Sequence, residues 1–289
     1  MKLKAFAKIN LGLDVVRKRE DGYHEVKMIM QTVGIFDRLE LLEEEEPGIR
    51  VSTNLHFLPK DENNLVYKAA KLLMEEKNVK KGLSIHLDKH IPVAAGMAGG
   101  SSDAAAVFVG VNKLFHLGFT MKELMERAVK IGADVPYCIM RGTALSEGIG
   151  EILTPLSPMP DCHILVAKPP INVSTKFVYE NLRVQELPSH PDIDGMTEAI
   201  RDGNLYGITE RMGNVLETVT EKNYPVISEL KTYMKEHGAL GALMSGSGPT
   251  VFGIFDDERY AKEAYAGLRK EEMARQVFLT SPINRKRGK

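Results

Sequence analysis

The segment from Ile91 to Ala106, which reads IPVAAGMAGGSSDAAA, restricts the fold of this chain more than any other. It holds three glycines within five positions, and two serines and an aspartate then precede an apolar run from Ala104 to Val111. An apolar run of this length predicts a buried helix, whose first turn has unpaired N–H groups and the positive end of the helix dipole. Because glycines let a ligand approach the backbone closely, the segment predicts a cradle for an anion such as a di- or triphosphate.

A simpler interpretation of this segment is a glycine-rich turn in which a serine or Asp103 caps the helix. A cap alone does not account for three glycines and two serines before a buried helix, so we favour phosphate binding. The segment fits neither the Walker A motif nor the dinucleotide-binding G-x-G-x-x-G motif, and the protein-kinase motifs H-R-D and D-F-G are absent from the chain. For Asp103 itself, a helix cap and a role in the site both stay open.

The composition excludes several other classes of protein. Lys plus Arg number 38 and Asp plus Glu 39, so no overall positive charge favours nucleic acid or an anionic membrane as a partner. No apolar stretch reaches the ~20 residues of a membrane span, and the N-terminus resembles neither a signal peptide nor a transit peptide. The two cysteines, Cys138 and Cys162, lie in strand-like apolar runs and are expected to be buried thiols. We therefore expect a cytoplasmic protein, with the basic run Arg285–Lys289 as a solvated end.

Helical and strand-like patterns alternate irregularly along the chain, which favours the α+β class. The acidic run Glu43–Glu46 with Pro47-Gly48 predicts a hairpin turn, and three prolines in Thr154–Pro160 predict a domain boundary. We therefore expect two α+β domains, residues 1–155, which carry the phosphate loop, and residues 156–289. Apolar periodicity predicts strands over Leu3–Ile9, Phe36–Leu42, Ile49–Thr53, Leu83–Leu87, Ile139–Ile152, Ile164–Ala167 and Val251–Phe255. It predicts helices that begin near Leu65, Ser101 and Thr120. Further helices are predicted over Thr175–Leu182, Asp194–Asp202, Leu205–Thr218, Pro225–His237 and Arg259–Glu271.

Several separate blocks of the sequence carry a resemblance to a known family. They are Ala7–Leu11 (AKINL) with Arg19–Glu25 (REDGYHE), Pro92–Ala104, Met244–Phe252 (MSGSGPTVF) and the shorter Gly132–Pro136 and Asn214–Glu217. In this order they resemble the GHMP kinases over nearly the whole chain, and within that superfamily the kinases whose acceptor is 4-diphosphocytidyl-2-C-methyl-D-erythritol. Ala98 departs from the pattern, because many loops of the superfamily have glycine or serine there, and we expect an altered fit with binding retained.

The resemblance implies a fold of two α+β domains with the active site in the cleft between them. It also implies ATP-dependent phosphorylation of the 2-hydroxyl of this cytidine-diphosphate-linked sugar alcohol, a step of non-mevalonate isoprenoid synthesis. Mg²⁺ is expected together with ATP, because it bridges nucleotide phosphates in such reactions. The sequence has no convincing dedicated metal ligand, with Ser102 the one candidate, and His86 and His90 are expected to face solvent. We expect a monomer or a weak homodimer.

Two residues of these blocks are implied to be catalytic. The resemblance gives Asp134 the role of the base that accepts the hydroxyl proton, and Lys8 the role of keeping this carboxylate ionised and stabilising the transferring charge. Without the resemblance, Asp134 is an ordinary turn residue and Lys8 a surface lysine of a strand. The family pattern favours the catalytic roles.

The acceptor site is implied to contain aromatic side chains. Tyr23 and His24 match the family's cytidine-recognition pair, since a tyrosine ring offers a stacking face and a histidine can hydrogen-bond the edge of cytosine. Asn10 is expected to hold the substrate near Lys8. Tyr179 is the candidate for a second stacking ring, and the alternative that it is an aromatic on the core face of a helix stays open.

The nucleotide site is implied to lie in the glycine loop, with weaker candidates beside it. The loop residues expected to bind ATP are Pro92, Ala94, Gly96, Met97, Ala98, Gly99, Gly100, Ser101 and Ser102. Asn63, Leu65 and Lys89 are expected at the adenine. A second glycine turn, Gly246–Gly248, either binds diphosphate or only shapes the site.

Two other functions compete with this interpretation. Another small-molecule kinase of the superfamily, of the mevalonate or homoserine type, would share the Pro92–Ala104 loop but would not need the Asp21–Glu25 block. A non-catalytic relative that binds nucleotides would have little need for both Lys8 and Asp134. Turnover with a panel of acceptors separates the three.

Overall fold

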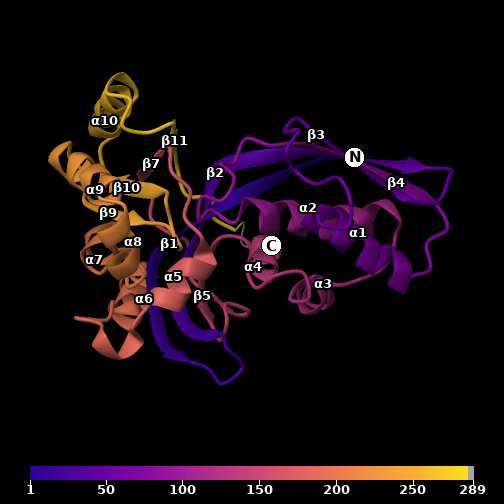
Figure 1. The fold of residues 1–289 in the computed structure, drawn as a ribbon, viewed down its shortest axis with the longest axis horizontal. Helices are drawn as coiled ribbons and strands as arrows, with labels where there is room; N and C mark the ends of the chain where they lie inside the picture. The colour runs from indigo at the N-terminus through magenta and orange to yellow at the C-terminus, as the bar shows by residue number, and fades with distance from the viewer. Residues whose placement is uncertain (286–289) are drawn as a thin grey trace. The chain divides into compact units, whose positions relative to one another are not determined.

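The computed structural model describes residues 1–285 (Figure 1). The last four residues of the basic run that is expected to be a solvated end, Lys286–Lys289, lie outside the described residues. Contacts between Cα atoms divide the chain into two compact units. The first comprises residues 1–7, 35–93 and 98–140, and the second residues 8–34, 94–97 and the chain from Arg141 onward. This division differs from the single boundary expected at residues 155 and 156, because the two long N-terminal strands and the glycine loop each run from one unit into the other.

The sheet of the first unit contains the C-terminal half of β2 with β4 and β3 to one side of it and the N-terminal end of β1 on the other side. β2 pairs antiparallel with β4 through Arg38–Glu44, and β3 pairs parallel with β4. The hairpin expected around Pro47-Gly48 is therefore wrong, since β4 lies between β2 and β3. The elements that lie in this unit, in whole or in part, are β1 (Lys2–Lys18), β2 (His24–Glu44), β3 (Ile49–Thr53), α1 (Leu65–Glu76), β4 (Gly82–Asp88), α2 (Gly99–Leu114), α3 (Met121–Ala128) and α4 (Val135–Met140).

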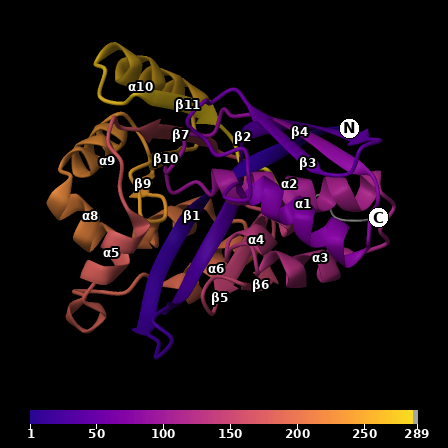
Figure 2. The same ribbon diagram turned by 45° about the vertical axis from the view of Figure 1, so that its right-hand side comes forward.

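The helix that follows the glycine loop forms the centre of this unit. α2 packs against α1 and α4, and α1 and α2 lie side by side in both ribbon views (Figures 1 and 2). A Cβ atom added to Gly110 would lie 2.4 Å from Leu41 and 2.5 Å from Leu3, so this glycine lets α2 approach the strands closely. The side chains of Asn64 and Thr120 cap α1 and α3, as their sequences predict.

The second unit contains an antiparallel sheet in the order β11-β7-β10-β9. α9 packs on β9 and β10, and α10 packs on β7 and β11. In the same unit β1 pairs parallel with β8, β2 pairs with β5, and β5 pairs with β6. The elements are β5 (Thr143–Glu147), β6 (Ile152–Pro155), β7 (His163–Lys168), α5 (Thr175–Asn181), a 3₁₀ turn (Val184–Glu186), α6 (Ile193–Arg201), α7 (Leu205–Glu210), β8 (Gly213–Asn214), α8 (Glu217–Asn223), α9 (Val226–Glu236), β9 (Gly241–Met244), β10 (Val251–Phe255), α10 (Glu258–Lys270) and β11 (Gln276–Thr280).

The expected α+β class is confirmed, and two expected elements are corrected. Ile139 belongs to α4 and not to a strand, because every residue of α4 is buried and a uniformly apolar run has no periodicity that separates helix from strand. Cys138 lies in the same helix, and both cysteines are buried as expected. The helix expected over Leu205–Thr218 is interrupted by β8, where the Asn214 side chain donates to the carbonyls of Met244 and Gly246.

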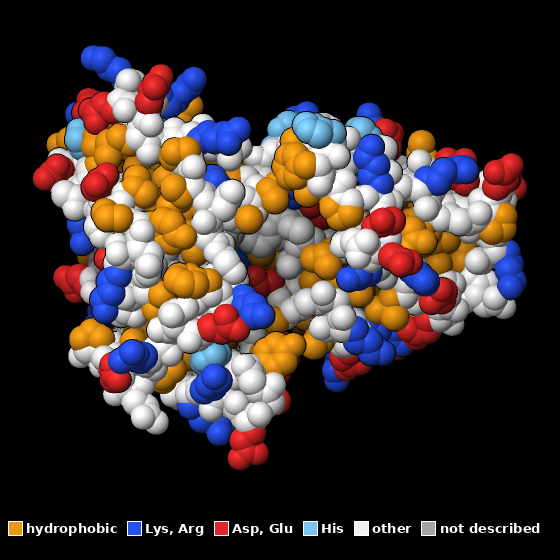
Figure 3. All heavy atoms as spheres, viewed as in Figure 1, with side chains coloured by type: hydrophobic (Ala, Val, Ile, Leu, Met, Phe, Trp, Pro, Cys, Tyr) orange, Lys and Arg blue, Asp and Glu red, His pale blue; other side chains and the backbone are white. Residues whose placement is uncertain are grey.

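Charged side chains of both signs are mixed on the face drawn in Figure 3, where Lys and Arg are interspersed with Asp and Glu. The formal net charge of the chain is −1. Within residues 1–285, no helix is both long enough and apolar enough to cross a membrane.

Candidate active site

The N-terminus of α2 offers free backbone donors. α2 begins at Gly99, its N-cap residue is Ala98, and no side chain within the described residues caps it. The amide of Ser102 donates to the Ala98 carbonyl, whereas those of Gly99, Gly100 and Ser101 have no hydrogen-bond partner in the described part of the chain. These three donors lie at the positive end of a 16-residue helix, which is the arrangement that binds phosphate oxygens. A capping role for Asp103 is excluded.

The glycine loop has a left-handed backbone at three of five positions. Ala94 has φ of 51°, Gly96 of 71° and Ala98 of 54°. Non-glycine residues in this region are strained by about 1–3 kcal/mol, and such strain clusters at ligand sites. The departure of Ala98 from the family pattern therefore falls at a position where glycine would adopt the backbone conformation without strain.

In the second unit, Lys8 is attached to the glycine loop. Its Nζ donates to the Gly96 carbonyl at 3.1 Å and to Asn10 Oδ1 at 2.8 Å, and its backbone N–H donates to the Met97 carbonyl. Ser245 Oγ donates to the same Gly96 carbonyl at 3.0 Å. Both Lys8 and Asn10 are buried, so the alternative that Lys8 is a surface lysine is wrong.

Asp134 lies in the first unit, immediately before α4. Its backbone carbonyl accepts the amide of Cys138, and its side chain is only partly buried. The position is the expected one, at the turn between α3 and α4. Its role as the base stays a prediction.

Two of the residues expected to bind the acceptor form an aromatic pair. The pair joins His24 to Tyr179, and not to Tyr23. The rings of His24 and Tyr179 lie 5.0 Å apart at 39°. Tyr179 is partly buried, while Val178 is the buried residue of α5, so Tyr179 does not belong to the core face of that helix. The Tyr23 side chain is 60% exposed. Burial and the charge of Lys18 lower the pKa of His24, which favours its neutral form.

The weaker nucleotide candidates have different settings. Leu65 lies beside the loop, 3.5 Å from a Cβ placed on Gly100. Asn63 is exposed and donates to Asp61. Lys89 is buried, and its Nζ donates to Asp37 at 2.5 Å and to Asp103 at 2.7 Å. The geometry therefore favours a bond from this ammonium to the two carboxyl groups over a direct contact with adenine. Among the remaining loop residues, Pro92, Met97 and Ser102 are buried and Ala94 is exposed.

The second glycine turn is enclosed by protein. Ser245, Ser247 and Thr250 are buried, and Asn214 holds the carbonyls of Met244 and Gly246. This setting favours the interpretation that the turn shapes the site. The sequence analysis missed Asn214 and Ser245 as site-shaping residues, although both fall within the blocks that carry the resemblance.

The side chains considered as metal ligands have other settings. Within residues 1–285, no three or more His, Cys, Asp or Glu side chains are grouped to hold a metal ion. Ser102 Oγ is buried and donates to the Phe6 carbonyl at 2.5 Å, with Cys138 Sγ at 3.3 Å. The hydroxyl therefore does not fit the role of a metal ligand, and His86 and His90 are exposed as expected.

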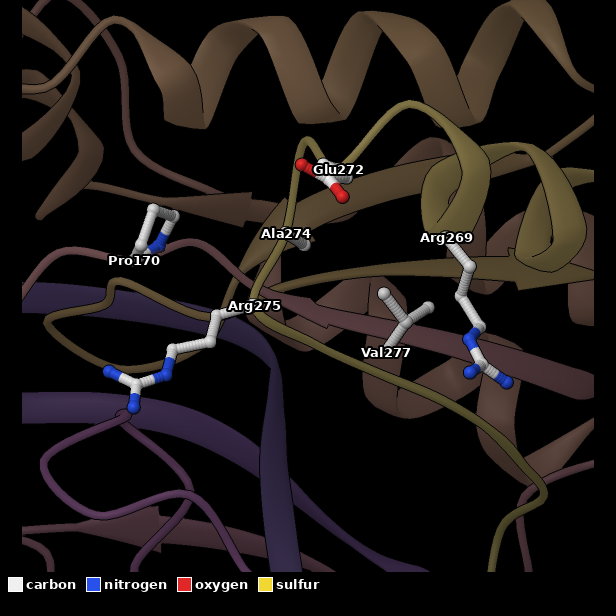
Figure 4. Close-up of a pocket in the computed structure, with 6 residues that line it drawn as sticks. All are labelled: Pro170, Arg269, Glu272, Ala274, Arg275 and Val277. Atoms are coloured by element: carbon white, nitrogen blue, oxygen red, sulfur yellow. The ribbon is translucent and has the colours of Figure 1, made fainter.

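A cavity of about 370 Å³ lies elsewhere in the second unit (Figure 4). Its lining includes Arg269 and Arg275, whose guanidinium groups point away from each other, and none of the predicted site residues. The other lining residues are Pro170, Glu272, Ala274 and Val277.

Comparisons with known proteins agree with these features. Residues 64–142 match the family model of the GHMP kinases N terminal domain, and residues 196–274 match that of the GHMP kinases C terminal. A curated relative from Lachnospira eligens, named 4-diphosphocytidyl-2-C-methyl-D-erythritol kinase, is 58% identical over 280 residues, or 97% of each chain. A crystal structure of 4-(cytidine 5'-diphospho)-2C-methyl-D-erythritol kinase has a TM-score of 0.84 at 32% identity, covering 98% of this chain and 99% of that one. A homoserine kinase from Cytophaga hutchinsonii has a TM-score of 0.75 at 20% identity, covering 97% and 93%, which shows a common fold alone.

Proposed function

Because this chain belongs to the GHMP kinases, in the family of the 4-diphosphocytidyl-2-C-methyl-D-erythritol kinases, we propose that it transfers a phosphoryl group from ATP to the 2-hydroxyl of that acceptor. The observation that carries the proposal is the set of three free amides at the start of α2, in a chain 58% identical to a relative of that name. The products are the 2-phosphate and ADP.

The nucleotide phosphates accept hydrogen bonds from the amides of Gly99, Gly100 and Ser101. Transfer of a phosphoryl group requires positioning and charge neutralisation more than covalent chemistry. The buried Lys8 ammonium supplies positive charge, and its bonds to Asn10 and Gly96 hold it in one place. Mg²⁺ that enters with ATP would neutralise further phosphate charge.

Asp134 accepts the proton of the attacking hydroxyl in this proposal. The acceptor's cytosine stacks on the Tyr23 ring, with Tyr179 as the second stacking ring, and the neutral imidazole of His24 bonds the edge of the base. Asn10 helps to hold the acceptor. Leu65 borders the adenine, since it lies beside Gly100.

A coupled assay of ADP release tests the proposal. The protein is given ATP and Mg²⁺ with 4-diphosphocytidyl-2-C-methyl-D-erythritol, methylerythritol phosphate, mevalonate or homoserine. Turnover with the cytidyl acceptor alone supports the proposal. Turnover with another acceptor favours a different GHMP kinase, and ATP binding without turnover on any of the four favours a non-catalytic nucleotide-binding protein.

Three further expectations belong to the same proposal. The chain acts in the cytoplasm, where ATP is available, and it is a monomer or a weak homodimer, which light scattering at several concentrations tests. Limited proteolysis tests the domain division at residues 155 and 156, with cleavage expected in the proline-rich segment Thr154–Pro160.

A further inference from the structure

A buried ion cluster lies beside the N-terminus of α2 in the first unit. Lys89 Nζ donates to Asp37 Oδ2 at 2.5 Å and to Asp103 Oδ2 at 2.7 Å, and all three side chains are at most 5% exposed. Surface ion pairs contribute little to stability, but charges buried at this depth must be compensated by one another. We call these three residues the Lys89 cluster.

The Lys89 cluster holds both ends of the loop. Asp37 Oδ1 accepts the amides of His90 and Ile91, which directly precede the loop, at 2.5 and 2.7 Å. Asp103 belongs to the first turns of α2, which directly follows the loop. Lys89 therefore connects a carboxylate that fixes the entry of the loop to a carboxyl group that fixes its exit.

The backbone of Lys89 is fixed as well. The Asn54 side chain accepts the Lys89 amide at 2.9 Å and donates to the Lys89 carbonyl at 3.1 Å. A Cβ atom placed on Gly99 would lie 3.2 Å from Lys89 Nζ, so the ammonium lies directly against the first residue of α2. Its charge acts on the helix N-terminus although the side chain is not exposed to a ligand.

The two carboxyl groups have unequal surroundings. Asp37 accepts two backbone amides and the Lys89 ammonium, so both of its oxygens have partners. Asp103 accepts only Lys89, and its buried Oδ1 has no partner among the described residues. Burial and the neighbouring charge of Asp37 raise the pKa of Asp103 well above its usual range, although Lys89 opposes the shift.

We propose that Lys89 and Asp103 are positioning residues for the nucleotide: the Lys89 cluster fixes the free amides of α2 where the phosphates bind, without touching ATP. The inference rests on the proposed nucleotide site.

Asp103→Leu and Asp103→Asn test this inference as a pair. Leucine removes the bond to Lys89 at similar volume, whereas asparagine keeps an acceptor for Lys89. For Asp103→Leu we expect KM and Kd for ATP to rise about tenfold, with kcat and KM for the acceptor changed less than about threefold. For Asp103→Asn we expect wild-type values.

Lys231→Met is the matched control. Lys231 is also held by two carboxylates, Glu217 at 2.6 Å and Glu221 at 2.7 Å, in the second unit. We expect this variant to have a lower Tm and an unchanged KM for ATP. If KM for ATP rose as much in Lys231→Met as in Asp103→Leu, lost stability alone would weaken ATP binding, and the inference would be overturned.

Three other results would also overturn it. They are an unchanged Kd for ATP in folded Asp103→Leu, an equal loss of ATP affinity in Asp103→Asn, which would mean that the bond from Lys89 to this position does not position the loop, and a wild-type protein that does not bind ATP. Calorimetric Kd values separate this inference from the proposed function. If the wild type binds ATP without turnover, the proposed function fails, while the Kd of Asp103→Leu still decides the inference.

Discussion

Replacement of Gly96 by alanine probes the backbone of the glycine loop. A Cβ atom there would lie 2.1 Å from the Ser245 carbonyl oxygen, whereas ordinary Cβ contacts begin at 3.4 Å, so the loop must move by more than about 1 Å. The positive φ of 71° adds about 1–2 kcal/mol for a non-glycine residue. Losing the bond from Lys8 to the Gly96 carbonyl adds about 1.5–3 kcal/mol, because its donor is charged.

We therefore expect Gly96→Ala to lower the free energy of unfolding by about 2.5–5 kcal/mol. A misplacement of about 1 Å at a catalytic group can lower the rate by about 10²-fold, and we expect kcat/KM to fall by at least this factor. Urea unfolding and the ADP-release assay measure the two effects.

Gly203→Ala is the control for the cost of a positive φ at a non-glycine residue. Gly203 has φ of 67° in the same unit, and a Cβ atom there would meet nothing within 4 Å. We expect it to lower the free energy of unfolding by about 1 kcal/mol and to leave turnover unchanged. Equal effects of the two substitutions on stability and on kcat/KM would refute the reasoning from the Ser245 contact.

Three further predictions concern the proposed chemistry. We expect Lys8→Ala and Asp134→Ala each to lower kcat by at least about 10²-fold in folded protein, and near-normal turnover in either would remove that residue's assigned role. Tyr23→Ala should raise KM for the cytidyl acceptor far more than KM for ATP, and equal effects would argue against stacking. Because burial and Lys18 lower the pKa of His24, the unfolded chain binds this proton more readily, so stability is lost as the pH falls from about 6.5 through the folded pKa. Thermal unfolding at pH 7.5 and 5.5 should show a smaller loss for His24→Gln than for the wild type, and an equal loss would contradict this account.

Interpretations based on local pattern were the more successful part of the sequence analysis. Asn64 and Thr120 cap their helices as predicted, because a cap involves residues only two or three positions apart. The hairpin at Pro47-Gly48 is wrong for the opposite reason. A turn motif shows that the chain reverses, but it does not show which strand pairs with which, and here β4 takes the position between β2 and β3.

The glycine loop, the buried helix after it, the α+β class and the kinase family could all be predicted from the chain alone. These depend on residue types at short spacing and on blocks in a fixed order. The pairing of Lys89 with Asp37, 52 residues away, and the bond from Ser245 to the Gly96 carbonyl, 149 residues away, became visible in the folded molecule alone. Such partners are selected by packing and by the need to compensate buried charge and buried carbonyls, and neither requirement leaves a local pattern in the chain.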